Sequence, residues 1–109
     1  MSELNDIIAS DSLYGKRAGE DRFVISIEVG RPHKFGGTSP TEWVCPLRVD
    51  PFFSSGSKIH GEGSLQALCL AVEMVRFLLA NFLEEGGDIT LEGGEQFSLK
   101  THWPKWDWS

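Results

Sequence analysis

The sequence contains only two cysteines, Cys45 and Cys69, and neither belongs to a Cys-x-x-Cys pair. Both lie in apolar stretches, which argues against a secreted disulfide scaffold and favours reduced core residues in a cytoplasmic protein. The three histidines, His33, His60 and His102, lie in separate segments without the spacing of metal ligands. We therefore expect neither a metal site nor a cofactor.

Basic residues are also scarce, with 10 lysines and arginines against 16 acidic residues and a net charge of −6. Such a chain repels phosphate backbones, so a basic protein is a better partner than nucleic acid. The twelve glycines form no phosphate-binding motif, so a nucleotide site has no local support. The first residues lack a basic start followed by an apolar run, and we expect no signal peptide.

One long apolar segment, residues 65–83, could suggest a membrane span, but charged and amide side chains interrupt it. Charges inside a span are costly, so we expect no membrane association. The contents of 40% hydrophobic and 24% charged residues are ordinary for a globular chain. The length suits a single domain over residues 1–109. Residues 1–5 are its candidate disordered end, and residues 101–109 are a tryptophan-rich tail.

Alternating apolar residues predict strands in the first half of the chain. The clearest run is RFVISIEVG at residues 22–30, where every second residue from Phe23 is apolar. A weaker strand at residues 5–14 precedes it, and a polar hairpin loop follows that strand. The proline- and glycine-rich residues 31–40 predict a second loop.

Residues 41–50, TEWVCPLRVD, predict a further strand. Because Pro46 cannot donate a hydrogen bond, we expect this strand to be an edge strand or to be bulged. The segment PFFSSGS at residues 51–57 then predicts a turn, and residues 58–63 predict a short fourth strand.

From Ser64 the apolar period changes, and the next twenty or so residues predict a helix that Ser64 caps and that ends at Gly86-Gly87. The polar positions form one narrow stripe: Gln66, Glu73, Arg76 and Glu84. A helix so apolar must be covered on most of its circumference. A sheet would cover one side, and either the C-terminal tail or a second subunit would cover more.

Beyond the helix, the runs DITL and QFSL flank Gly93-Gly94, which predicts a hairpin. The predicted fold class is therefore α+β with two layers. An antiparallel meander sheet of four to six strands packs against one long helix.

Two motifs resemble those of an uncharacterised family of small bacterial proteins, a domain of unknown function. The first is Trp43-Val44-Cys45-Pro46, a W-x-C-P motif at a strand, and the second is the helix start at residues 61–68, G-x-x-S-L-Q-A-L. The resemblance covers about residues 7–85 and not the final two dozen residues. It implies a soluble bacterial α+β domain and supplies no catalytic residues.

His60, Glu62 and Ser64 lie within five residues and could suggest a catalytic triad. Each has a simpler role, because Ser64 can cap the helix and Glu62 favours its positive end. Catalytic triads are assembled across a fold, so we do not expect an enzyme here. A ligand pocket between sheet and helix, lined by Trp43, Cys45 and His60, remains an alternative.

The acidic residues Glu84, Glu85 and Asp88 surround the predicted end of the helix, where carboxylates oppose the helix dipole. A charge run of this kind is usually a solvated face, and the alternative is a docking patch for a basic partner. Trp103, Trp106 and Trp108 stand in the last seven residues. Their rings can either cap the apolar helix or anchor a partner, and Trp106 and Trp108 are the candidate partner-binding residues.

The first functional hypothesis is a non-enzymatic bacterial protein-protein interaction domain, such as an immunity-like inhibitor that blocks a basic toxin in the cytoplasm. Its warrant is the acidic charge, the small size and the lack of a catalytic motif. A small-ligand-binding or enzymatic domain and a structural homodimer remain the alternatives.

Overall fold

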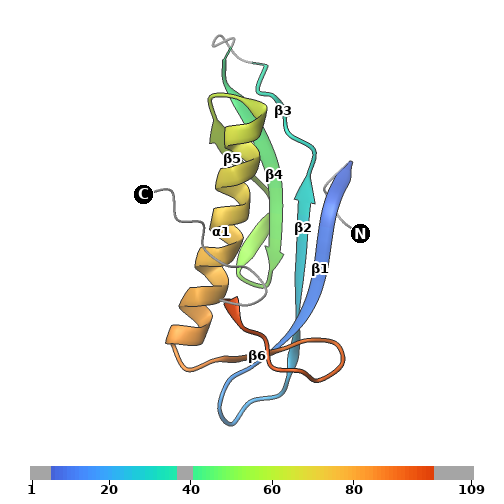
Figure 1. Ribbon diagram of the computed structural model, residues 1–109, viewed down its shortest axis with the longest axis vertical. Helices are drawn as coiled ribbons and strands as arrows, with labels where there is room; N and C mark the ends of the chain where they lie inside the picture. The colour runs from blue at the N-terminus through green and yellow to red at the C-terminus, as the bar shows by residue number, and fades with distance from the viewer. Residues whose placement is uncertain (1–5, 37–40, 100–109) are drawn as a thin grey trace.

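The computed structural model describes residues 6–36 and 41–99, and within residues 54–56 it describes the backbone alone. These residues form six strands and one helix. In chain order they are β1 (Ile7–Lys16), β2 (Phe23–Gly30), β3 (His33–Lys34), β4 (Trp43–Asp50), β5 (Phe53–Gly61), α1 (Ser64–Glu84) and β6 (Asp88–Thr90). The strands form one antiparallel sheet, and α1 packs along one face of it (Figure 1). The predicted α+β fold class is confirmed.

The sheet begins as a meander and closes with a return strand. β1 pairs with β2, β2 pairs with β4, and β4 pairs with β5, each time antiparallel. After α1 the chain crosses the sheet, and β6 pairs with the end of β1 at Tyr14–Lys16. The helix contacts mainly β4 and β5, the two strands that precede it in the chain.

β4 lies inside the sheet, so the prediction of an edge or bulged strand at Pro46 was wrong in its first form. One side of β4 pairs with β5, and the other side pairs with β3 at Trp43–Val44 and with β2 at Leu47–Asp50. Pro46 falls in the gap between these two partners, where no ladder bond is required of it. A Cβ atom on Gly30 would lie 3.0 Å from the Pro46 Cβ atom, so the two residues pack closely.

Two further boundaries differ from the sequence prediction. The loop expected at residues 31–40 contains the two-residue strand β3, which pairs with β4. The turn expected at residues 51–57 is short, because β5 already begins at Phe53 and pairs with β4 from Val49 to Trp43. The peptide bond between Asp50 and Pro51 is cis.

The helix has the predicted length but not the predicted cap. Its N-cap is Gly63, no side chain caps it, and Ser64 is its first residue. The Gln66 side chain instead accepts a hydrogen bond from the Glu62 backbone amide at 2.6 Å. At the other end Gly86 adopts a φ of 93°, a left-handed conformation that ends helices, so the predicted stop is confirmed.

The core lies between the sheet and one side of α1. The helix contributes its five buried residues Ala67, Ala71, Val75, Leu79 and Phe82. The sheet contributes alternate residues of β2 and β4, among them Ile25, Ile27, Cys45, Leu47 and Val49. The β6 hairpin adds Ile89 and Phe97, where the Phe97 amide donates to the Ile89 carbonyl at 3.0 Å. The predicted hairpin around Gly93-Gly94 is present in this form.

Candidate functional site

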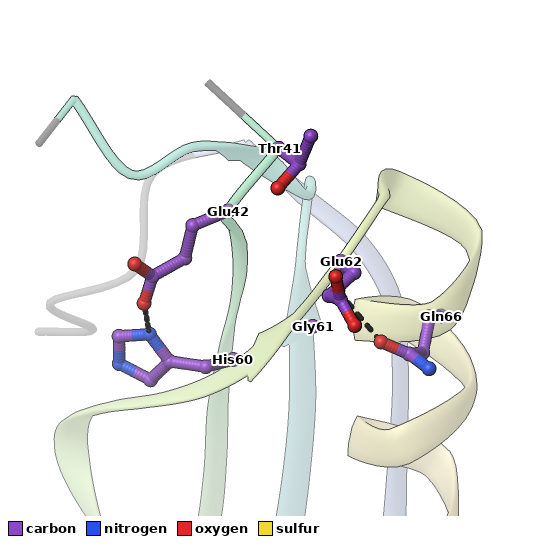
Figure 2. A pocket seen from close by; sticks show the side chains of 6 residues that line it. All are labelled: Thr41, Glu42, His60, Gly61, Glu62 and Gln66. Carbon is purple, nitrogen blue, oxygen red and sulfur yellow. Dashed lines mark hydrogen bonds and ion pairs between the residues drawn. The ribbon is translucent and has the colours of Figure 1, made fainter. Parts of the chain in front are cut away.

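A polar depression lies where β4, β5 and the start of α1 meet, next to the loop that precedes β4 (Figure 2). Its volume is about 350 Å³, and it is lined by Thr41, Glu42, His60, Gly61, Glu62 and Gln66. The imidazole Nδ1 of His60 donates to a carboxylate oxygen of Glu42 at 2.6 Å. The Phe35 ring stands edge-on to the imidazole, with 5.2 Å between the centroids.

The chemistry of this depression is limited. His60 is about half exposed and Glu42 about one-third exposed, so the pair is well solvated. Thr41 supplies the one hydroxyl group of the lining, which contains neither a serine nor a cysteine. Among the described residues, no three side chains of His, Cys, Asp or Glu come together to hold a metal ion.

The three residues of the predicted ligand pocket are not brought together. Trp43 and Cys45 belong to the cluster under α1, and Cys45 is fully buried. The Cys45 thiol donates to the Gly30 carbonyl at 3.4 Å, and burial raises the pKa of this thiol. His60 pairs with Val44, next to Cys45 along β4, so its side chain points to the opposite face of the sheet. His60 and Glu62 do meet at the depression, whereas Ser64 does not line it.

The most unusual surface of the described chain is the side of α1 that faces away from the core. Four large apolar side chains are exposed there: Leu65 by 71%, Leu70 by 43%, Val72 by 48% and Phe77 by 61%. No other described strand or helix lies over this side of α1 (Figure 1). We call these four residues the apolar surface of α1.

A polar stripe divides the apolar surface into two flanks. With about 100° per residue, the exposed residues Gln66, Glu73 and Glu84 lie above one another. Leu65 and Val72 lie on one side of the stripe, and Leu70 and Phe77 lie on the other. The predicted stripe is present without Arg76, which is half-buried and lies about 60° around the helix from Glu73, and the apolar residues beside the stripe are exposed. The sheet covers one side of α1, as expected, whereas the C-terminal tail and a second subunit, the two covers expected for the rest, lie outside the described residues.

By length and composition α1 is also the one described helix that could cross a membrane, with a mean hydropathy of 1.5. Only 28% of its most apolar window is buried inside the molecule. One such helix is weak support for a span, and the core helix of a globular domain passes the same test. Here the buried part of α1 packs on the sheet, and its exposed part carries Glu73 and Glu84.

The predicted acidic residues lie together at one end of the molecule. Glu84 ends α1, Glu85 caps it, and Asp88 begins β6, and all three are exposed. The last turn of α1 contains no basic residue. The Gln96 side-chain amide donates to the Asp88 carboxylate, which connects the β6 hairpin to this end. We call these three carboxylates the acidic corner. Trp106 and Trp108 lie outside the described residues.

A family model, described as a domain of unknown function (DUF6968), matches residues 15–100. The chain belongs to the DUF6968 family. The match contains the strand motif around Trp43 and the helix start at residues 61–68. It continues beyond residue 85 through β6, farther than the sequence resemblance indicated. Neither a curated protein nor a solved structure matches this DUF6968 chain.

The sequence indicates the acidic corner as a partner site, and it indicates the outer side of α1 only as a surface that the tail or a second subunit covers. The signal was available, because Leu65 and Val72, like Leu70 and Phe77, are seven residues apart and share a helix face. The pattern was interpreted as core because an apolar helix is usually covered. The Glu42–His60 contact had no sequence signal, since it depends on the pairing of β4 with β5.

Proposed function

We propose that this DUF6968 domain is a non-enzymatic protein-binding domain whose contact surface is the apolar surface of α1. The observation that carries the proposal is the exposure of Leu65, Leu70, Val72 and Phe77 on a helix that is otherwise part of the core. Exposed apolar residues on both sides of a polar stripe are typical of protein contact sites.

The charge of the domain defines the kind of partner. The net charge is −6, and the acidic corner lies at the C-terminal end of the same helix. The partial negative charge of a helix C-terminus adds to that of the carboxylates. A basic protein would therefore associate faster with this surface, and the apolar contacts would slow its release.

The narrower form of this proposal is an immunity-like inhibitor that blocks a basic toxin in the bacterial cytoplasm. The small acidic α+β domain and its exposed helix support this form. In the same proposal Trp106 and Trp108 supply aromatic anchors for the partner. A structural homodimer through α1 is the alternative within the same class.

The test is capture of a partner by the immobilised full chain at low salt, followed by purification of the captured protein and calorimetric titration. We expect a basic protein whose affinity falls at least about tenfold between about 50 and 300 mM salt, because screening weakens charge pairs. The double variant Glu84→Lys, Glu85→Lys should weaken the same complex at low salt. An affinity that neither salt nor charge reversal changes would contradict the proposal, as would the retention of no protein at all.

The polar depression supports a second candidate function, the binding of a small ligand. The contact that favours it is the 2.6 Å hydrogen bond from His60 to Glu42, which orients an exposed imidazole. A thermal-shift screen of metabolites separates the two functions. Stabilisation that is lost in His60→Ala would support the small-ligand site.

A further inference from the structure

We infer that the part of the partner that docks on α1 is a cationic amphipathic helix, and that it packs along Leu70 and Phe77. This inference rests on the proposed function and names the chemistry of the partner. Its support comes from the spacing of the exposed side chains and from the charges beside them.

The spacing is that of a helix-packing seam. Six positions of α1 follow each other at alternating intervals of four and three residues, and they combine the flank of Leu70 and Phe77 with the polar stripe. They are Gln66, Leu70, Glu73, Phe77, Ala80 and Glu84. This is the interval at which one helix presents residues to a second helix beside it. Leu70 and Phe77 are exposed by 43% and 61%, so the apolar middle of this seam is accessible.

The charges on the seam are acidic. Glu73 lies between Leu70 and Phe77, and Glu84 lies at the end of the seam, both exposed. Glu85 and Asp88 follow directly, and no basic residue in the last turn balances them. Arg76 lies beside the seam, so one basic residue stands against the five acidic positions Glu62, Glu73, Glu84, Glu85 and Asp88 of α1 and its two ends. A helix that covers Leu70 and Phe77 is therefore best matched when it carries lysine or arginine opposite Glu73 and Glu84.

The same charges argue against the other occupants of the seam. A second copy of the chain, also with a net charge of −6, would bring Glu73 near its own counterpart when the two helices are antiparallel. The C-terminal residues 101–109 contain one lysine and one aspartate and so bring no net positive charge. A lipid surface would desolvate Glu73 and Glu84 without pairing them. A cationic helix complements both the apolar positions Leu70 and Phe77 and the carboxylates Glu73 and Glu84.

The helix dipole favours one orientation of the partner. Carboxylates and a partial negative charge lie together at the C-terminal end of α1. The partial positive charge of a helix N-terminus is best placed there, so the partner helix runs antiparallel to α1. The 21 residues of α1 extend over about 31 Å, and a partner helix of similar length covers the whole seam.

The experiment uses a labelled synthetic peptide of about 21 residues, long enough to span α1. It has leucine at the a and d positions of its heptads and lysine at the flanking positions. Binding to the full chain is followed by fluorescence anisotropy. Two peptides serve as controls: one has the same composition in an order without helical periodicity, and one has glutamate in place of lysine. We expect the cationic amphipathic peptide to bind with micromolar affinity, the aperiodic peptide to bind at least about tenfold more weakly, and the acidic peptide not to bind.

The test variant is the double variant Leu70→Ser, Phe77→Ser, and the matched control is Val24→Ser. Val24 is also an exposed apolar residue, at 53%, but it lies on β2. The double variant at Leu70 and Phe77 should weaken peptide binding at least about tenfold, and the Val24 variant should leave it unchanged. Equal binding by the unchanged protein, the double variant and the Val24 variant would overturn the inference, because the attraction would then come from charge alone. Far-ultraviolet circular dichroism of each variant confirms that it is folded.

Three further results would also overturn it. Sedimentation equilibrium could show a dimer that Phe77→Glu dissociates, which would assign the seam to a second copy. Removal of residues 101–109 could raise the affinity for the peptide, which would assign the seam to the tail. Flotation with phosphatidylcholine vesicles could show binding that depends on Phe77, which would assign it to a lipid surface.

The outcome is separable from that of the proposed function. If the purified partner still binds the double variant at Leu70 and Phe77 but no longer binds a variant changed at Leu65 and Val72, the inference fails and the proposed function stands. If the partner loses binding to the double variant at Leu70 and Phe77 but not to the variant at Leu65 and Val72, the inference and the proposed function are both supported.

Discussion

Gly61 connects β5 to α1 at the closest approach of the two elements. A Cβ atom at this position would lie 2.7 Å from the backbone nitrogen of Ala67 and 2.9 Å from its Cα. Because these neighbours are backbone atoms of the first helical turns, they cannot move as a flexible side chain would. The absence of a side chain at Gly61 therefore places the start of α1 directly on the sheet.

The first prediction follows from this contact. Gly61→Ala should lower the free energy of unfolding by about 1–3 kcal/mol, the usual cost of overpacking. The matched control is Gly93→Ala, where the nearest atom is a Glu95 carboxylate oxygen at 3.9 Å. Urea denaturation followed by circular dichroism measures both variants. Equal stability of the two variants would show that the helix can shift away from β5 without cost.

Residue-scale details were the least predictable from the sequence. Ser64 was expected to be the N-cap, but Gly63 takes that position and Gln66 binds the preceding backbone amide instead. Pro46 was expected in an edge strand or at a bulge, but it lies where β4 changes partner from β3 to β2, and the register shift against β5 falls after it, between Leu47 and Val49. Both outcomes depend on tertiary pairing, which single-residue preferences do not contain.

At the scale of elements, α1 has two sides with different roles. One side of the helix packs in the core, and its residue Leu79 is fully buried. The other side exposes residues of the same type, with Leu65 exposed by 71%. The apolar residues of α1 therefore exceed what folding of the described chain requires, and this excess is the basis for a binding role.

Identical substitutions on the two sides of α1 test this division. Leu79→Ala should destabilise the protein by about 2–5 kcal/mol, because it removes buried atoms and leaves a cavity. Leu65→Ala should change the free energy of unfolding by less than about 0.5 kcal/mol, as exposed positions usually do. Thermal and urea unfolding of both variants provide the comparison. A large loss of stability in Leu65→Ala would mean that its side chain is covered in solution by another part of the chain.

Element identity was largely predictable, and element length was not. The period of the apolar residues identified β1, β2, β4, α1 and the final hairpin. β5 was underestimated, because serine and glycine at its start are typical of turns, yet the backbone there pairs with β4. β3 has two residues and exists only through its pairing with β4, so no local pattern predicts it.

At the scale of the whole molecule, the sheet and one side of α1 form the hydrophobic core, and the other side of α1 is exposed among the described residues. The acidic corner lies at the C-terminal end of that helix, so charge and apolar surface belong to one continuous region. Most of this region lies inside the part of the chain that the DUF6968 family model matches. The sequence indicated the acidic residues by composition. The seven-residue spacing of the apolar residues places them on the helix surface, but their exposure depends on which elements the fold places over the helix.

The two cysteines provide a probe of this region. Cys69 is exposed on α1, whereas Cys45 is buried and its raised pKa lowers its thiolate content. One thiol of the free folded protein should therefore be alkylated quickly, and Cys69→Ser should abolish that fast phase.

The most direct measurement of the binding role of α1 is the alkylation rate of Cys69 in the saturated complex with the purified partner. If the partner covers α1, the rate should fall at least about tenfold relative to the free protein, as access of the reagent to the thiol is lost. An unchanged rate in the saturated complex would contradict contact across the whole apolar surface of α1, because Cys69 lies between its two flanks, about 60° around the helix from Val72 and about 100° from Leu70.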